Sequence, residues 1–133
     1  MKSFINTLLL ISLFAFVVSS CEEDEANELK LEFKVGASYT SEDITLPAGT
    51  VVTIGIEAET EKSKDPIISF NISESVNGGS NATVYTESLN DTDYEHDYTF
   101  TLGGNSGETH KFTFTITNKD GINKQIDLTV TVQ

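Results

Sequence analysis

The sequence has no tryptophan, no arginine, one cysteine and two prolines in 133 residues. A single cysteine excludes an intramolecular disulfide, so the burial of apolar side chains has to hold the fold together. Eight lysines stand against 21 acids, which gives a formal net charge of −13. Nucleic acid is recognised through fields of lysine and arginine, and the opposite sign of this chain excludes nucleic acid as a partner.

The N-terminal residues have the layout of a secretory signal. Lys2 precedes an apolar stretch from Leu8 to Val18, and two small residues follow that stretch. A positive start, an apolar run and small residues in this order are typical of a signal that is removed. A helix over the apolar stretch would rise only about 16 Å, against about 30 Å for the hydrocarbon core of a bilayer. We therefore expect residues 1–20 to be a signal peptide and not a membrane span.

The residues Val18-Ser19-Ser20-Cys21 resemble a lipobox, the recognition site of bacterial lipoprotein signal peptidase. The resemblance implies that the Cys21 sulfur receives a diacylglycerol and that its new amino terminus receives a further acyl group. One acyl chain binds a membrane marginally, whereas two or more anchor a protein stably. We therefore expect the membrane to be a partner through the lipid on Cys21. The alternative is an ordinary secretory cleavage that leaves a free thiol.

Four acids, Glu22, Glu23, Asp24 and Glu25, directly follow the cysteine. They resemble the acidic export signal of Bacteroidota lipoproteins, which implies a lipid-anchored protein of the outer membrane that faces the cell surface. The alternative is a solvated linker, kept extended by the repulsion of its own charges. Residues 21–133 would carry seven lysines and 21 acids, a formal charge of −14, which suits a domain held away from an anionic membrane.

Apolar and polar residues alternate in segment after segment, which is the period of half-buried strands. Four segments show this most clearly: 52–58, 68–72, 112–117 and 126–132. In the second of them, Ile68, Phe70 and Ile72 are expected on the inward face. Weaker strands are expected at 29–35, 82–86 and 94–102, with turn signals between them at 46–49, 77–79, 103–107 and 119–121. No window of comparable length has a helical stripe.

Seven short strands with regular turn signals predict an all-β fold, a sandwich of two antiparallel sheets. We expect one domain at 29–133, preceded by a lipidated acidic tether at 21–28. The alternating faces predict one shared core, which contains Ile54, Ile56, Phe70, Phe112, Phe114, Leu128 and Val130.

The segment KFTFTITNKDGINKQIDLTVTV, residues 111–132, resembles the closing hairpin of immunoglobulin-like and PKD-like domains of bacterial surface proteins. The resemblance implies an immunoglobulin-like architecture. The chain departs from these families because it has no tryptophan, no cysteine pair and no WDFGDG-type motif, so no family's function is carried over. As a whole, the chain resembles the small stand-alone lipoproteins of Bacteroidota.

The densest group of carboxylates is Asp91, Asp93, Glu95 and Asp97, at every second position. Calcium prefers such oxygens, but an EF-hand loop that started at Asp91 would need Gly and Glu where His96 and Leu102 stand. In a strand over 94–102, Glu95 and Asp97 would instead share the solvent face. We therefore expect no cofactor, with calcium at these four carboxylates as the alternative.

The two histidines, His96 and His110, have no second ligand at zinc spacing, and we expect both on the polar surface. No nucleophile motif accompanies them, so an enzyme is not expected. Tyr39 and Tyr85 are the candidate ligand-binding residues, since each is expected near a turn or a strand end. The expected function is a binding or adhesion module for a glycan or a protein. The alternative is a structural accessory subunit of an outer-membrane envelope complex, for which a free strand edge would be the sign.

Overall fold

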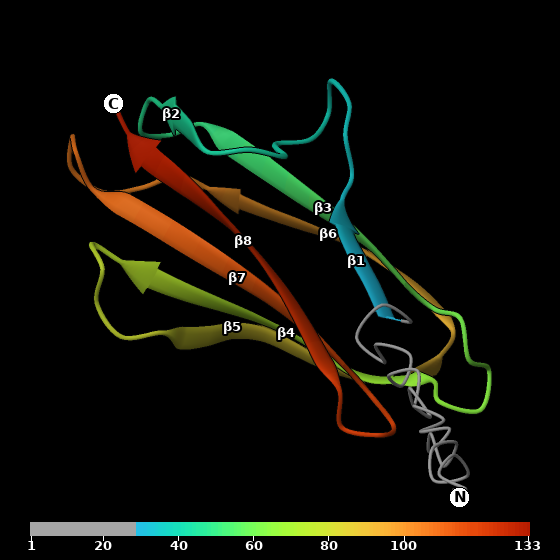
Figure 1. Cartoon of the computed structure of the whole chain (residues 1–133). Coiled ribbons are helices and arrows are strands. Elements are labelled where there is room, and N and C mark those ends of the chain that lie inside the picture. Colours follow the sequence, from blue (N-terminus) through green and yellow to red (C-terminus); the bar gives the residue numbers. More distant parts are fainter. Residues whose placement is uncertain (1–28) are drawn as a thin grey trace, which may run out of the picture.

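The protein is described by a computed structural model over residues 29–133, in which all regular elements are strands (Figure 1). The alternation of apolar and polar residues is the local cause, because it gives each strand one face to bury. The eight strands are β1 (Leu29–Phe33), β2 (Ile44–Leu46), β3 (Val51–Thr60), β4 (Ile67–Val76), β5 (Ala82–Asp91), β6 (Asp93–Thr101), β7 (Thr109–Asn118) and β8 (Asn123–Val132).

The strands form two sheets that pack face to face. One sheet has three strands in the order β1-β3-β6, and the other has five in the order β2-β8-β7-β4-β5. All pairs are antiparallel except β2 with β8, which run parallel. The long strands of both sheets run along a common diagonal in Figure 1, as in aligned sandwiches. The predicted all-β sandwich is therefore confirmed.

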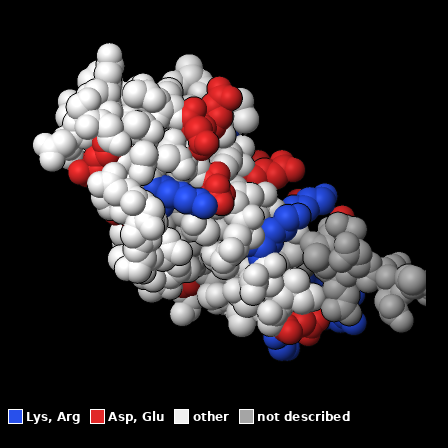
Figure 2. All heavy atoms as spheres, turned by 60° about the vertical axis from the view of Figure 1, so that its left-hand side comes forward, with Lys and Arg blue, Asp and Glu red and all other residues white. Residues whose placement is uncertain are grey.

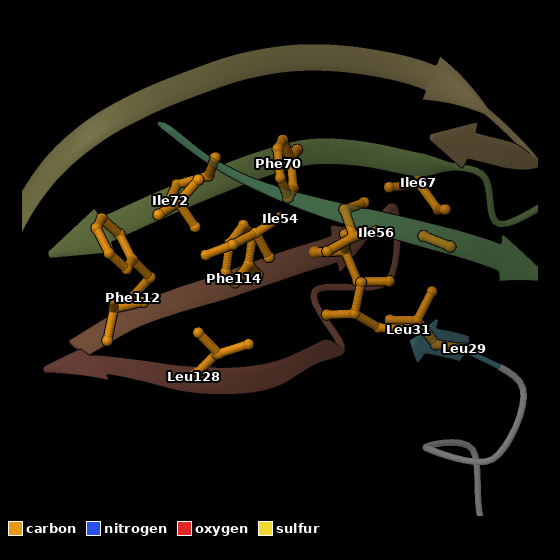
Figure 3. Packing of buried hydrophobic residues seen from close by; sticks show 14 of the residues in the cluster. Leu29, Leu31, Ile54, Ile56, Ile67, Phe70, Ile72, Phe112, Phe114 and Leu128 are labelled. Atoms are coloured by element: carbon orange, nitrogen blue, oxygen red, sulfur yellow. The ribbon is translucent and has the colours of Figure 1, made fainter. Parts of the chain in front are cut away.

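One hydrophobic core fills the space between the sheets. Figure 3 shows side chains of β1, β3, β4, β7 and β8 that meet there. All seven residues predicted for a shared core are buried, and none of them is more than 1% exposed. Phe33 of β1 contacts Phe114 of β7 edge to face, with 5.7 Å between the ring centroids. The predicted inward faces of β3, β7 and β8 are correct.

The prediction of seven strands was wrong by one, because it omitted β2. This strand has only three residues, and none of its side chains is fully buried, so it shows no alternating pattern. Its pairing depends on a distant partner, β8, and Asp43 Oδ1 reinforces the junction by accepting a hydrogen bond from Thr129 N at 2.8 Å. The parallel β2–β8 pair also corrects the prediction of purely antiparallel sheets.

The predicted register at the start of β4 was also wrong. Ile68 was expected on the inward face with Phe70 and Ile72, but Ile67 is the fully buried residue and Ile68 is 38% exposed. The ladders of β4 with both β5 and β7 shift register between Ile67 and Ser69. A bulge of this kind adds a residue, so the alternation changes phase at that point.

The predicted turns fall between strands, except that the first of them begins at Leu46, the last residue of β2. In the turn between β4 and β5, Asn77 has a φ of 51° and Gly78 a φ of 72°. Gly79 N donates to Val76 O at 2.9 Å and closes the turn. Positive φ at both central residues is the requirement of a type I′ turn, which favours Asn-Gly.

Candidate functional site

Charged side chains form rows across the outer face of the three-stranded sheet. The pairing of β1 with β3 and of β3 with β6 sets residues of all three strands opposite one another. The rows are Lys30, Glu59 and Asp93, and next to it Glu32, Glu57 and Glu95. Like charges directly opposite one another across strands are destabilising. A cation close to the second row would therefore stabilise the fold.

A hollow of about 310 Å³ opens over these two rows. Its lining residues are mainly acidic: Lys30, Glu32, Glu57, Ala58, Glu59, Asp93, Tyr94 and Glu95. Lys30 is the one cation in the lining, and its Nζ lies 2.9 Å from Glu59 Oε1 and 3.6 Å from Glu61 Oε1. Within residues 29–133, Glu32 and Glu57 form no ion pair. The hollow therefore presents carboxylates whose charge is not neutralised by direct contact.

Lys34 follows β1 and lies next to Glu95, at one end of the row of three glutamates. Its side chain connects β1 with β6 and with the turn that contains Tyr39. Its Nζ is 2.9 Å from Asp97 Oδ1 and 3.3 Å from Glu95 Oε2, and it lies 5.5 Å from the ring centroid of Tyr39. Tyr39 OH donates to Asp97 Oδ2 at 3.2 Å. The hydrogen bond from Lys34 is the main cause that lowers the pKa of Asp97, and the same bond raises the pKa of Lys34. The predicted ligand residue Tyr39 is thus part of an ordered polar cluster.

Gly55 makes room for this cluster in the middle of β3. A Cβ at this position would lie 2.7 Å from both Lys34 Cδ and Tyr39 Cε1, and 2.9 Å from Asp97 Oδ1. Such distances are closer than packed atoms allow, so any side chain here would displace at least one member of the cluster. A glycine inside an alternating strand signals a close approach of this kind. The sequence contained that signal, but not the identity of the groups that approach.

A second polar cluster closes the side of the sandwich between β5 and β6. Glu87 Oε2 accepts hydrogen bonds from Tyr85 OH at 2.8 Å and from Tyr94 OH at 2.5 Å. The His96 ring lies 4.4 Å from the Tyr85 ring and 5.2 Å from the Phe70 ring, measured between centroids. These four half-buried groups of β5 and β6 meet although the two strands belong to different sheets.

Burial and hydrogen bonding shift the pKa values in this cluster in defined directions. The hydrogen bonds from Tyr94 and Tyr85 lower the pKa of Glu87, because they stabilise its ionised form. Burial lowers the pKa of His96, and burial together with the bond to Glu87 raises the pKa of Tyr94. At neutral pH the cluster therefore holds one carboxylate, a neutral imidazole and neutral phenols.

The expectation that both histidines lie on the polar surface was wrong. His96 and His110 occupy inward positions in the alternation of β6 and β7. The His110 side chain is only 12% exposed, and its Nδ1 lies 2.7 Å from Glu74 Oε1. Its Nε2 lies 3.0 Å from Glu108 Oε1 and 3.1 Å from the carbonyl oxygen of Gly103. Both ring nitrogens therefore face acceptors, which joins β4, β7 and the loop before β7.

The other candidate residues are distributed over both sheets. Asp91 ends β5, and Asp93, Glu95 and Asp97 lie along the outer face of β6, where Glu95 and Asp97 share the predicted solvent face with Thr99. No group of three or more metal-ligating side chains occurs in the described range. Tyr85 lies inside β5, which extends five residues beyond the predicted strand end at 86. Its ring faces the cluster and not a loop.

The predicted lipidation site Cys21 and the acids Glu22, Glu23, Asp24 and Glu25 lie outside the described residues. Among residues 29–133, no helix is long and apolar enough to cross a membrane. On the face shown in Figure 2, most of the surface is uncharged, and the acids lie in separate groups, only some of which have a lysine beside them. The charge is thus unevenly distributed over the surface.

The chain matches no protein-family model and no curated protein. Among solved structures, it is similar to Spo0M, a sporulation control protein from Bacillus subtilis, with 13% sequence identity and a TM-score of 0.47. The match covers 80% of this chain and 49% of Spo0M, so the chain corresponds to about half the length of that protein.

Proposed function

We propose that this protein is a lipid-anchored, non-catalytic binding or adhesion module of the outer membrane that faces the cell surface and engages a glycan or a protein. The observation that carries the proposal is the acid-lined hollow of about 310 Å³ on the outer face of the three-stranded sheet. Ligand sites are usually concave and contain a few convergent polar groups that orient the ligand. Glu32 and Glu57 are available there to accept hydrogen bonds from hydroxyls or to pair with a cationic group.

We assign the fold to the immunoglobulin-like class. In that architecture, strands A, B and E form one sheet, while G, F, C and C′ form the other. The orders β1-β3-β6 and β8-β7-β4-β5 correspond to these two sets in chain order, and β2 adds to the edge of the second set. Domains of this architecture occur in many cell-surface proteins, so the fold supports a recognition role but identifies no ligand.

The tether rests on the sequence features at Cys21 and Glu22 to Glu25. Residues 29–133 form one domain, so a binding role would rest on the surface of this domain.

A structural accessory subunit is the second candidate, and the free edges of β5 and β6 favour it. Both strands have a partner on one side only, and they are ten and nine residues long. Long free edges are templates for pairing with another chain.

The two candidates separate in a pull-down from detergent-solubilised envelope, carried out beside a glycan array. We expect a reproducible ligand whose binding is lost in Glu57→Lys, because that change reverses a charge inside the hollow. Glu42→Lys makes the same change in net charge at an exposed residue outside the hollow and is the matched control. Stoichiometric recovery of one envelope protein by both variants, with a silent array, would replace the binding role by the accessory role.

A further inference from the structure

Strand β6 is a long edge strand whose free side faces no other strand of residues 29–133. It pairs with β3 on one side only, from Asp93 to Thr101. The edges formed by β1 and β2 are five and three residues long. The edge formed by β5 carries Glu87 on its inward face, and an inward-pointing charge is a feature that discourages strand pairing. Of these four edge strands, β6 is thus the one that is long and has no inward-pointing carboxylate to discourage pairing.

The direction of the backbone groups of β6 follows from its contacts. Thr92 O accepts a hydrogen bond from Thr60 N, and Leu102 N donates to Thr50 O, so the even-numbered residues direct their polar backbone groups towards β3. Backbone groups alternate in direction along a strand. Those of Asp93, Glu95, Asp97, Thr99 and Thr101 therefore point to the free edge.

The residues with edge-directed backbone groups also carry the acids of β6. Asp93, Glu95 and Asp97 lie on the outer face at every second position. A strand that paired with this edge would place its own outward side chains directly opposite these acids. A second copy of β6 in antiparallel pairing, in the register that sets Glu95 opposite Glu95, would place acid against acid at each of these positions. A strand with lysine or arginine at every second position would place opposite charges there instead.

The inward face of β6 gives the other half of the pattern. Tyr94, His96, Tyr98 and Phe100 alternate with the acids, and none of them is fully buried. On the facing sheet, Tyr85 and Leu89 of β5 are also only partly buried. The inward residues of β3 and β7, by contrast, are buried almost throughout. A strand added beside β6 would widen the narrower sheet over these half-buried rings.

We propose that the β6 edge binds an extended segment of another protein in which basic and apolar side chains alternate. The segment adds a fourth strand to the three-stranded sheet. Its basic residues lie opposite the acids of β6, and its apolar residues lie beside the half-buried aromatic side chains on the inward face of β6. Backbone hydrogen bonds supply affinity in this mode, and alternate side chains supply specificity. This inference goes beyond the ligand of the hollow: it assigns a protein partner to the free β6 edge, the feature that also favours the accessory role.

The geometry of immunoglobulin-like sandwiches agrees with this place for the added strand. In the four-stranded sheet of such domains, strand D lies beside strand E, at the edge that corresponds to β6. Here β5 leads into β6 through Thr92 alone, so the chain has no strand D between them. The acidic residues Glu22 to Glu25 have the wrong charge to occupy that place.

The test uses the full mature protein in a neutral detergent and a ten-residue peptide of alternating lysine and valine as the probe. We expect slower hydrogen exchange at the amides of Glu95, Asp97 and Thr99 when the peptide binds. The amides of Tyr94, His96 and Tyr98 already bond to β3 and serve as the internal reference. A glutamate–valine peptide of the same pattern should leave exchange unchanged.

Two pairs of variants separate the backbone and the charge contributions. Thr99→Pro removes an edge-directed amide and should abolish peptide binding, whereas Thr99→Ala should retain it; both lose the same Oγ1 contact with Thr53. Asp93→Asn combined with Glu95→Gln should weaken binding between about twofold and thirtyfold, from two cross-strand charge pairs.

Protection that maps to β5, or equal binding by Thr99→Pro and Thr99→Ala, would overturn the β6 inference. The proposed function would survive either result if the pull-down or the array still yields a ligand that depends on Glu57. Failure of the peptide, the pull-down and the array together would overturn both.

Discussion

At the scale of single residues, Gly55 is a position where the structure requires the absence of a side chain, which the alternating strand pattern alone does not indicate. Its missing side chain leaves space for Lys34, Tyr39 and Asp97. We expect Gly55→Ala to displace the Lys34 side chain and to lower the melting temperature. Gly103→Ala is the matched control, because a Cβ there would meet no atom within 4 Å. Thermal unfolding measures both, and equal melting temperatures would mean that the cluster moves aside without cost.

Phe114 and Thr113 test the register of β7. Phe114 is fully buried between the sheets, while its neighbour Thr113 lies on the outer face. Truncating a buried phenylalanine to alanine typically costs about 3–5 kcal/mol, from lost burial and the cavity that remains. We therefore expect Phe114→Ala to lose that much free energy of unfolding in urea titrations, and Thr113→Ala much less. Similar losses at both positions would contradict the register.

At the scale of elements, the alternating pattern was sufficient wherever a strand has one buried and one exposed face. It predicted the inward residues of β3, β7 and β8, because a strand's two faces alternate strictly. It failed at Ile68, where a bulge changes the phase, and at β2, which is held by a distant partner and buries little. Neither a bulge nor a non-local pairing leaves a periodic signal in the local sequence.

The polar clusters show the same limit for the candidate site. Tyr39 and Asp97 were each singled out from the sequence, but their contact joins positions 58 residues apart. The role of Glu87 was not predicted, because its inward-facing carboxylate on β5 accepts a hydrogen bond from Tyr94, which belongs to the other sheet. His96 was misassigned because its type suggested the surface, whereas its place in the alternation of β6 is inward. For His96, the position in the alternating pattern predicted the side-chain orientation better than the residue type did.

At the scale of the whole molecule, the pKa shifts predict loss of stability in acid, in two ranges. Burial holds the pKa of His96 below its ordinary value of 6.5, so the unfolded chain takes up this proton at a higher pH than the folded one. Stability should therefore decrease as the pH falls below about 6.5. The pKa of Glu87 is also lowered, below its ordinary value of 4.5, and its contribution is lost at lower pH still.

Urea midpoints measured from pH 8 to pH 3 check this prediction. We expect His96→Phe to remove the decrease that begins below pH 6.5 and to keep the one that begins below pH 4.5. The substitution retains an aromatic ring among Phe70, Tyr85 and Tyr94, so the packing is preserved as far as a neutral ring allows. An unchanged decrease just below pH 6.5 in the variant would assign that decrease to other groups.

A tether at Cys21 would determine where the whole molecule acts, and the lipobox-like residues before Cys21 predict the form of that tether. We expect the native protein to begin at Cys21 with acyl chains on it, as read by mass spectrometry, and Cys21→Ala to release or misroute the protein. A soluble, unmodified form that begins at another residue would contradict lipidation.

The acids after Cys21 predict the side of the outer membrane on which the domain lies. If Glu22 to Glu25 direct export, protease added to intact cells should remove residues 29–133. Replacing the four acids with alanine should then protect the domain until the outer membrane is broken. As a control, alanine at the exposed residues Glu42 and Asp120 also removes charge, but far from the cysteine in sequence, and should leave the domain exposed. Protection of the unaltered protein in intact cells would place it in the periplasm, out of reach of any ligand outside the cell.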